Sequence, residues 1–406
     1  MSLHMPTSAH PKEAHNVQWL AVIPILEIIH IISLSIWPSP YRPILFLPVV
    51  FLSAFVIFRS GISLQDYYAT YAIGIKLTTI TLLTSTDILL SEPQSEFRTK
   101  DHQSRSAYNS SSPFLSRLWW GLCVWINPRG INFAHEPKNL PPRPTETTNR
   151  AFYRRQIKGI VPYLILWELV GWLNRSNPYY YQLVDPSSIT GYRRLWRLAG
   201  VTYWFHLAYM LSPGYRLMSI VGVALGLSKP RNWPDMFASP REAYTIRRFW
   251  GIFWHKLFRR IFTTHADFIA SKLQLPKTGL FQRYFKTFVI FGFSGILHLG
   301  GDAIAMHSIT DSGLMITFLL QAVAIMTEDG VLWLLGRAGL RRSRFTKMVG
   351  YVYVFLWFSW CTTFSSDIQM RHGYAKGWGP RISVIEKLRV GKWTYVIPDD
   401  HPLGSS

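Results

Sequence analysis

The chain has 406 residues, of which 49% are hydrophobic, and its 43 Lys and Arg against 22 Asp and Glu give a formal charge of +21. The apolar residues gather in runs of membrane-helix length, which excludes an ordinary soluble fold. The basic residues lie between these runs, where they suit anionic lipid headgroups or a phosphate-bearing ligand better than nucleic acid. Cys123 and Cys361 are too few for a disulfide framework or a metal-ligand pattern.

Eight apolar runs predict eight membrane helices, with seven to nine allowed. They cover residues 20–37, 43–58, 66–84, 157–173, 199–227, 285–305, 313–335 and 346–365. The fifth run contains Ser212-Pro213-Gly214, so it is either one long broken helix or two short helices. We therefore expect an all-α, polytopic integral membrane protein.

The domain organisation follows from the same runs. We expect a polar N-terminal tail at 1–18, a membrane-embedded domain at 19–365 and a C-terminal tail at 366–406. The first apolar run reads as a retained anchor. Two basic segments, 91–156 and 228–284, are predicted to face the cytosol by the positive-inside rule. Eight crossings then place both termini on the lumenal side.

Residues 239–262 predict an amphipathic helix. Ser239 and Glu242 can form a capping box, and Pro240 suits the first helical position. Aromatic and aliphatic side chains fall on one face, and basic side chains fall on the other. The basic group is Arg248, His255, Lys256 and Arg259. The helix either lies in the membrane interface with snorkelling cations or also presents these cations to a phosphate-bearing cofactor.

Residues 288–306 carry polar groups at membrane depth. Ser294, His298 and Asp302 are spaced i, i+4, i+8, so they share one side of a helix. Ionisable residues inside a membrane are costly and usually face a protein interior or a wet cavity. The group therefore indicates either a functional site or a polar cluster that joins helices.

These two segments together resemble a known family. Phe249 to Arg259 reads FW-x-x-x-WH-x-x-x-R, and Phe291 to His298 reads F-x-x-S-G-x-x-H. In this order they resemble the wax synthase-like branch of the membrane-bound O-acyltransferases. The turn Asn127-Pro128-Arg129-Gly130, followed by Leu140-Pro141, is similar to an upstream element of that branch. The resemblance covers roughly residues 120–365.

The resemblance implies about eight helices, and up to eleven, around an intramembrane reaction chamber. It also implies that His298 is catalytic and that acyl-CoA is a co-substrate, with no permanently bound cofactor. Related sterol and diacylglycerol acyltransferases have an acidic residue directly after the histidine, where this chain has Leu299. We expect Asp302, one helical turn after His298, to replace that acidic residue and to hold the imidazole of His298 in one tautomer.

The expected mechanism begins with His298 removing a proton from the acceptor hydroxyl as its oxygen attacks the thioester. His255 or Trp254 would stabilise the oxyanion or place the thioester. Cations at the cytosolic mouth would hold the CoA phosphates. These are Arg248, Lys256 and Arg259. A hydrophobic alcohol would enter from the bilayer.

Fungal members of this branch include acetyltransferases of terpenoids and meroterpenoids. The resemblance therefore implies transfer of acetyl from acetyl-CoA to a terpenoid hydroxyl, in the endoplasmic reticulum membrane. Two alternatives remain open. One is a long-chain wax-ester or sterol acyltransferase, and the other is a transporter with a His/Asp proton relay, although the internal repeat typical of transporters is not visible.

Overall fold

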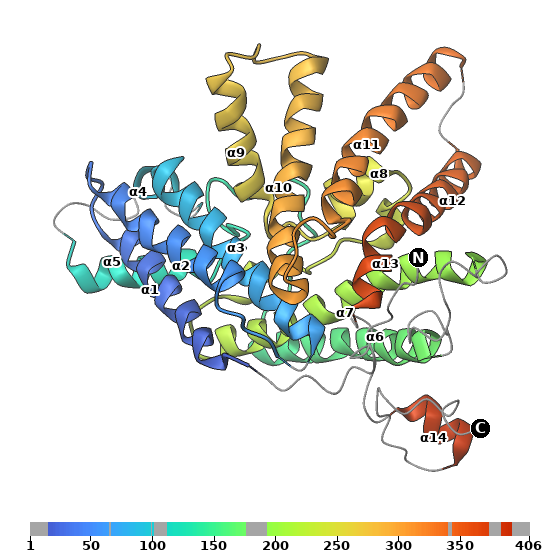
Figure 1. The fold of residues 1–406 in the computed structure, drawn as a ribbon, viewed down its shortest axis with the longest axis horizontal. Helices are drawn as coiled ribbons and strands as arrows, with labels where there is room; N and C mark the ends of the chain where they lie inside the picture. The colour runs from blue at the N-terminus through green and yellow to red at the C-terminus, as the bar shows by residue number, and fades with distance from the viewer. Residues whose placement is uncertain are drawn as a thin grey trace, which may run out of the picture.

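The computed structural model describes residues 15–64, 66–98, 100, 112–175, 193–339, 343–372 and 383–391. Within these ranges the regular elements are helices, as predicted, and a single isolated bridge joins His15 to Ser63. The α-helices, drawn in Figure 1, are α1 (Val22–Ser35), α2 (Phe46–Phe58), α3 (Tyr67–Leu89), α4 (Pro93–Glu96), α5 (Phe114–Trp125), α6 (Asn149–Arg175), α7 (Arg193–Ala224), α8 (Ile246–Arg248), α9 (Arg259–Lys272), α10 (Leu280–Met306), α11 (Leu314–Arg337), α12 (Arg344–Cys361), α13 (Thr363–Arg371) and α14 (Val384–Val390).

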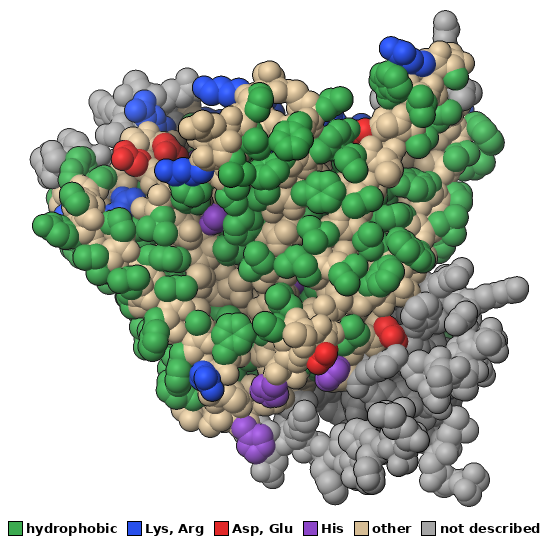
Figure 2. Space-filling model, turned by 45° about the horizontal axis from the view of Figure 1, so that its top comes forward, with side chains coloured by type: hydrophobic (Ala, Val, Ile, Leu, Met, Phe, Trp, Pro, Cys, Tyr) green, Lys and Arg blue, Asp and Glu red, His purple; other side chains and the backbone are tan. Residues whose placement is uncertain are grey.

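Four of the described helices are long and apolar enough to cross a membrane. They are Val17–Ser35, Tyr67–Leu89, Leu280–Met306 and Leu314–Arg337, and Arg42–Phe58 is a shorter apolar helix. Figure 2 shows hydrophobic side chains spread over much of the visible face. On α2, for example, Phe51 is 70% exposed. These surfaces confirm a membrane-embedded, all-α protein.

The other predicted runs are also helical. Residues 157–173 lie in α6, 199–227 lie mainly in α7, and 346–365 lie in α12 and the start of α13. The run with Ser212-Pro213-Gly214 is one helix, because α7 continues through Pro213 to Ala224. Figure 1 shows α6 lying crosswise to α10. The number of eight crossings stays a prediction.

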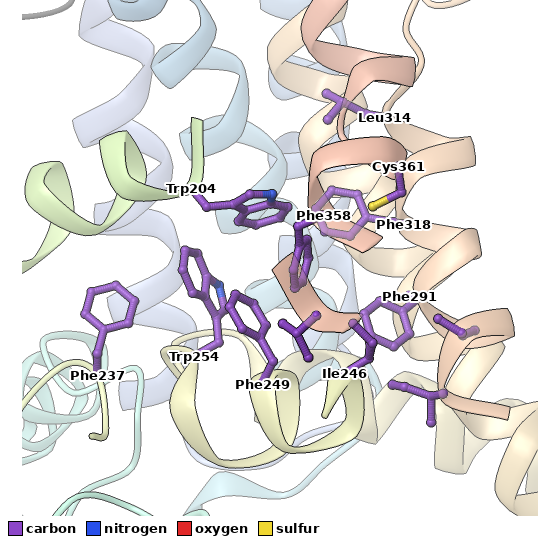
Figure 3. Packing of buried hydrophobic residues seen from close by; sticks show 14 of the residues in the cluster. Trp204, Phe237, Ile246, Phe249, Trp254, Phe291, Leu314, Phe318, Phe358 and Cys361 are labelled. Carbon is purple, nitrogen blue, oxygen red and sulfur yellow. The ribbon is translucent and has the colours of Figure 1, made fainter. Parts of the chain in front are cut away.

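An aromatic cluster joins α7, α11 and α12 to the chain before α9. Trp204 of α7 meets Trp254 edge to face, with ring centroids 5.2 Å apart, and Trp254 stacks on Phe249 at 5.4 Å. Phe249 also contacts Phe358 of α12 at 4.4 Å. Figure 3 shows these rings converging from different helices. Such pairs add about 0.5–1.5 kcal/mol each beyond the area they bury.

The single amphipathic helix predicted for 239–262 is wrong. The segment instead contains a 3₁₀ turn at Pro240–Glu242, then α8, then a π-helical turn at Phe249–Phe253, and α9 begins only at Arg259. The backbone becomes extended at Trp254, where φ is −67° and ψ is 153°. Lys256 donates from Nζ to the carbonyls of Gly251 and Ile252, at 2.8 and 3.1 Å. These carbonyls have no partner within the helix because the π-helical turn ends there.

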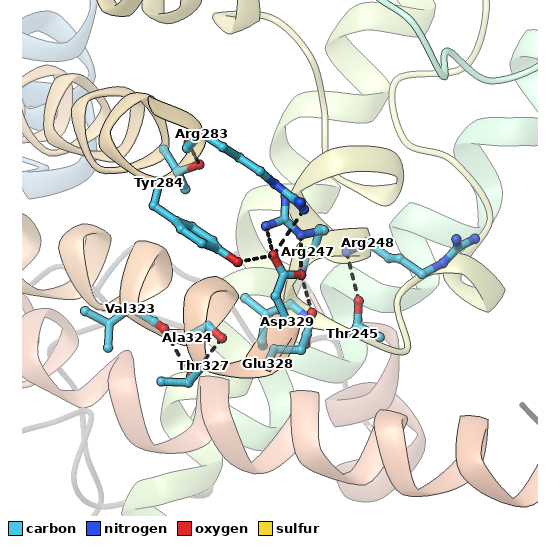
Figure 4. Close-up of polar contacts among 12 residues, drawn as sticks. Thr245, Arg247, Arg248, Arg283, Tyr284, Val323, Ala324, Thr327, Glu328 and Asp329 are labelled. Carbon is cyan, nitrogen blue, oxygen red and sulfur yellow. Dashed lines mark hydrogen bonds and ion pairs between the residues drawn. The ribbon is translucent and has the colours of Figure 1, made fainter. Parts of the chain in front are cut away.

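Contacts from distant helices explain where this segment breaks. The carboxylate of Glu328 on α11 accepts from the backbone N–H groups of Ile246 and Arg247, at 2.6 and 3.1 Å. Figure 4 shows this contact beside the pairing of Arg247 with Asp329. Glu242 pairs with Arg248 and so does not close the predicted capping box. Side chains of α11 therefore fix the start of α8.

Helices α3 and α10 touch through their backbones. A Cβ atom at Gly74 would lie 2.0 Å from the carbonyl oxygen of Gly300, and one at Gly301 would lie 2.5 Å from the ring of Tyr71. Glycines of this kind allow membrane helices to approach closely. The contact sets the distance between α3 and the histidine on α10.

A buried ionic cluster ties α1, α3 and α9 together. Asp87 on α3 is 1% exposed and pairs with Arg260 of α9 at 2.6 Å. His30 of α1 lies 3.3 Å from the same carboxylate through Nε2 and bonds Thr84 through Nδ1 at 2.9 Å. The cluster positions α9, which follows directly on the segment that contains His255.

Candidate active site

A cavity of about 520 Å³ lies between α3, α7, α10, α11 and the segment before α9. Its wall on α10 follows one face of that helix: Thr287, Ile290, Phe291, Ser294 and His298. Eleven residues separate the ends of this wall, which is about 16 Å at 1.5 Å per residue. The cavity is therefore long, with His298 at one end of its α10 wall.

His298 is held on two sides. Its Nδ1 lies 2.7 Å from the hydroxyl of Tyr71 on α3. Its ring stacks on Phe318 of α11, with centroids 4.8 Å apart and planes at 17°. Both neighbours also line the cavity. Because Nδ1 is engaged by Tyr71, Nε2 is the nitrogen available to a substrate.

Asp302 is placed differently from the prediction. Its carboxylate is fully buried and accepts from Tyr67 at 3.0 Å, from Gln369 at 2.8 Å and from Ser312 at 2.6 Å. These donors come from α3, α13 and the loop before α11. The structure thus brings Tyr71, rather than Asp302, to the Nδ1 atom of His298. Each four-residue step turns an α-helix by about 40° beyond a full circle, so Asp302 has rotated away from the face of Ser294.

His255 and Trp254 both line the cavity. The His255 ring lies 5.2 Å from the Trp254 ring and 5.9 Å from that of Phe258. Among the described residues, Nδ1 of His255 is buried and has no hydrogen-bond partner. A buried nitrogen of this kind can bind a polar group of a substrate. Trp254 is packed in the aromatic cluster drawn in Figure 3.

The three cations predicted to hold phosphate lie in different surroundings. Arg248 pairs with Glu242, and its guanidinium lies over the Tyr244 ring at 4.6 Å. Lys256 lines the cavity but is 4% exposed and bonds backbone carbonyls. Burial, with the nearby positive charge of Arg259 second, lowers the pKa of Lys256 to about 8.

Arg259 is exposed and lines the cavity, and its backbone carbonyl accepts from the hydroxyl of Thr263 at 2.8 Å. Its side chain makes no hydrogen bond or ion pair with another residue in the ranges that the structure describes. Of the three predicted cations, Arg259 is therefore the most available to an anionic ligand in the cavity.

Sequence reasoning missed Tyr71 and Phe318, the two residues that hold His298. Both lie inside apolar runs, where an aromatic residue gives no signal by itself. The sequence also indicated no role for the buried Arg129, which donates to the carbonyls of Pro234 and Asp235 at 3.1 and 3.2 Å. The turn around Arg129 thus supports the chain that leads into the cavity wall.

The fold and this site define a membrane-embedded protein with a half-buried histidine in a substrate-sized cavity. Residues 233–320 match the model of the family described as "Membrane bound O-acyl transferase family", and this region contains both His255 and His298. The chain is 31% identical to acetyltransferase eriL of Hericium erinaceus over 366 residues, which are 88% of this chain and 92% of that protein. It is 28% identical to acetyltransferase ple2 of Rhodocybe pseudopiperita over 82% of this chain and 85% of that protein.

The chain therefore belongs to the membrane bound O-acyl transferase family, and it is an O-acyltransferase. This confirms the resemblance drawn from the motifs around His255 and His298.

Proposed function

We propose that this protein transfers acetyl from acetyl-CoA to a hydroxyl of a terpenoid or meroterpenoid alcohol. The observation that carries the proposal is His298, whose ring lines the cavity while Tyr71 engages its Nδ1. Two relatives that match over more than four fifths of their length are both named acetyltransferases, which supports acetyl as the acyl group.

The reaction begins at Nε2 of His298, which takes the proton of the acceptor hydroxyl as the oxygen attacks the thioester carbonyl. The oxyanion that forms is stabilised from the segment before α9, where His255 and Trp254 face the cavity. The carbon–sulfur bond then breaks, and the imidazolium returns its proton to the CoA sulfur. The products are the acetyl ester and free CoA.

The cavity serves as the reaction chamber, and the eight predicted runs cross the membrane of the endoplasmic reticulum. The basic segments 91–156 and 228–284 face the cytosol. Arg259 belongs to the second segment, so the part of the cavity that Arg259 lines opens toward cytosolic acetyl-CoA. The apolar acceptor reaches His298 from the bilayer. In the ranges that the structure describes, all eight runs are helical, which supports this arrangement.

The acyl group can be tested directly with microsomes that contain the protein. They are incubated with labelled acetyl-CoA or labelled palmitoyl-CoA and a terpenoid extract, and ester products are separated. We expect label from acetyl-CoA to appear in terpenoid esters. Efficient transfer of palmitoyl without transfer of acetyl would favour a long-chain wax-ester or sterol acyltransferase.

Replacing Arg259 with Ala should raise the KM for acetyl-CoA. A hydrogen bond to a charged group contributes about 1.5–3 kcal/mol, so we expect an increase of about 10-fold or more. The maximal rate should change little, because a contact with the CoA phosphates is made equally in the ground state and in the transition state. Initial rates over a range of acetyl-CoA concentrations measure both quantities.

Arg248→Ala is the matched control, since this arginine already pairs with Glu242. Its KM should stay near that of the unmodified protein. An equal rise in both variants would mean that general positive charge attracts the donor. No rise in Arg259→Ala would remove Arg259 from the donor site.

A further inference from the structure

A histidine that accepts a proton at Nε2 needs a partner that keeps the other ring proton on Nδ1. Sequence spacing suggested Asp302 for this part, but its carboxylate is occupied by Tyr67, Gln369 and Ser312. The atom that meets Nδ1 is the hydroxyl of Tyr71, at 2.7 Å. We propose that Tyr71 is the positioning residue of His298, acting through it on the acyl transfer proposed above.

The geometry leaves the imidazole little freedom. The Tyr71 hydroxyl fixes the Nδ1 edge of the ring, and Phe318 covers one face at 4.8 Å. The Tyr71 and His298 ring planes differ by 24°, with centroids 6.4 Å apart. Rotation of the imidazole would break the hydrogen bond and the stacking together.

Tyr71 itself is fixed by the contact between α3 and α10. Its side chain is 3% exposed, and its ring lies where a Cβ atom at Gly301 would be, at 2.5 Å. One turn further along α3, Gly74 lies against the backbone of Gly300. The two glycines at 300 and 301 thus admit the tyrosine ring beside the helix that carries His298.

The chemistry suits a neutral partner. With its proton on Nδ1, His298 donates to the phenol oxygen and presents the Nε2 lone pair to the acceptor hydroxyl. When Nε2 takes the proton, the same Nδ1–H bond becomes charge-assisted and stronger. In this arrangement Tyr71 holds the imidazole in place and stabilises the imidazolium without exchanging a proton.

The test compares Tyr71→Phe with Tyr67→Phe, a matched pair on one helix. Each variant removes one phenol oxygen and keeps the ring. The assay is transfer of labelled acetyl from saturating acetyl-CoA to the terpenoid extract, per amount of protein that elutes as a folded peak. Tyr71→Phe should lower the maximal rate by about 10- to 100-fold with an unchanged KM for acetyl-CoA. Tyr67→Phe should change the rate far less, because Asp302 keeps two other donors.

A double variant separates positioning from general support. Once His298 is Ala, removal of the Tyr71 hydroxyl should cost nothing further, so the double variant should be as slow as His298→Ala alone. If the rate losses of the two single variants multiply in the double variant, Tyr71 acts on the reaction independently of His298. If the residual rate of His298→Ala is too small to measure, the comparison of Tyr71→Phe with Tyr67→Phe decides.

Two failures remain distinct. A folded Tyr71→Phe variant with a normal rate, beside an inactive His298→Ala, overturns the role of Tyr71 and leaves the proposed reaction in place. A folded His298→Ala variant with a normal rate overturns the proposed base, and with it the role of Tyr71.

Discussion

Replacement of His298 by Ala should abolish acetyl transfer while the protein still inserts and still binds acetyl-CoA. General-base assistance contributes about 10²–10⁴ in rate, so the loss should appear in kcat and not in KM. The measurement is the rate of labelled acetyl transfer at saturating acetyl-CoA, with binding of acetyl-CoA followed separately. The expectation rests on the place of His298 in the cavity wall.

Loss of a half-buried histidine can also harm folding, so a second histidine serves as the control. His265 of α9 is buried and bonds Ser85 and the carbonyl of Ile261, and it is not among the residues that line the cavity. His265→Ala should keep its rate per folded molecule, even where less protein is recovered by gel filtration. Near-normal transfer by folded His298→Ala would make His255 the next candidate base.

Replacement of Asp87 by Ala should be among the most destabilising single changes in the described part of the chain. The variant leaves Arg260 and His30 without the carboxylate that faces both. Removal of one partner of a buried ion pair costs about 3–5 kcal/mol, because the remaining charge stays buried. Thermal unfolding followed by size-exclusion chromatography in detergent should show a clearly lower midpoint, or no folded protein.

Asp267→Ala on α9 is the matched control. Asp267 pairs with Lys286, but its side chain is 59% exposed, and pairs of this kind contribute only about 0–1 kcal/mol. Its unfolding midpoint should stay close to that of the unmodified protein. Equal midpoints for the two variants would show that the cluster around Asp87 does not support the fold.

Local patterns in the sequence predicted the helices well. Runs of apolar residues mark helices because backbone groups in lipid must be bonded within the segment, so composition and length are sufficient. The same reasoning identified His298, since an ionisable group at membrane depth needs a reason to be there. Trp254 and His255, from the other motif, also line the cavity, although their backbone is not part of the predicted helix.

Contacts between distant residues account for what the sequence did not reveal. Periodicity predicted one helix over 239–262, but Glu328, 82 residues after Ile246, accepts from its N–H and starts a new short helix there. Spacing placed Asp302 beside His298, but three donors from other elements hold that carboxylate. Tyr71 could not have been paired with His298 from one sequence, because no local pattern connects positions 227 residues apart.

The contact between α3 and α10 also has a consequence for biosynthesis. Tyr71 and His298 are 227 residues apart, so at roughly 5–20 residues per second the ribosome needs about 11–45 s to travel from one to the other. During that interval α3 is in the membrane without α10, so the face of α3 that contains Gly74 lacks its later contact with Gly300. Helices α1 and α2, which pack on α3 in the finished protein and precede it in the chain, are already present and can accompany it. His298 thus meets Tyr71 only late in translation, when an N-terminal part of the bundle has had time to assemble.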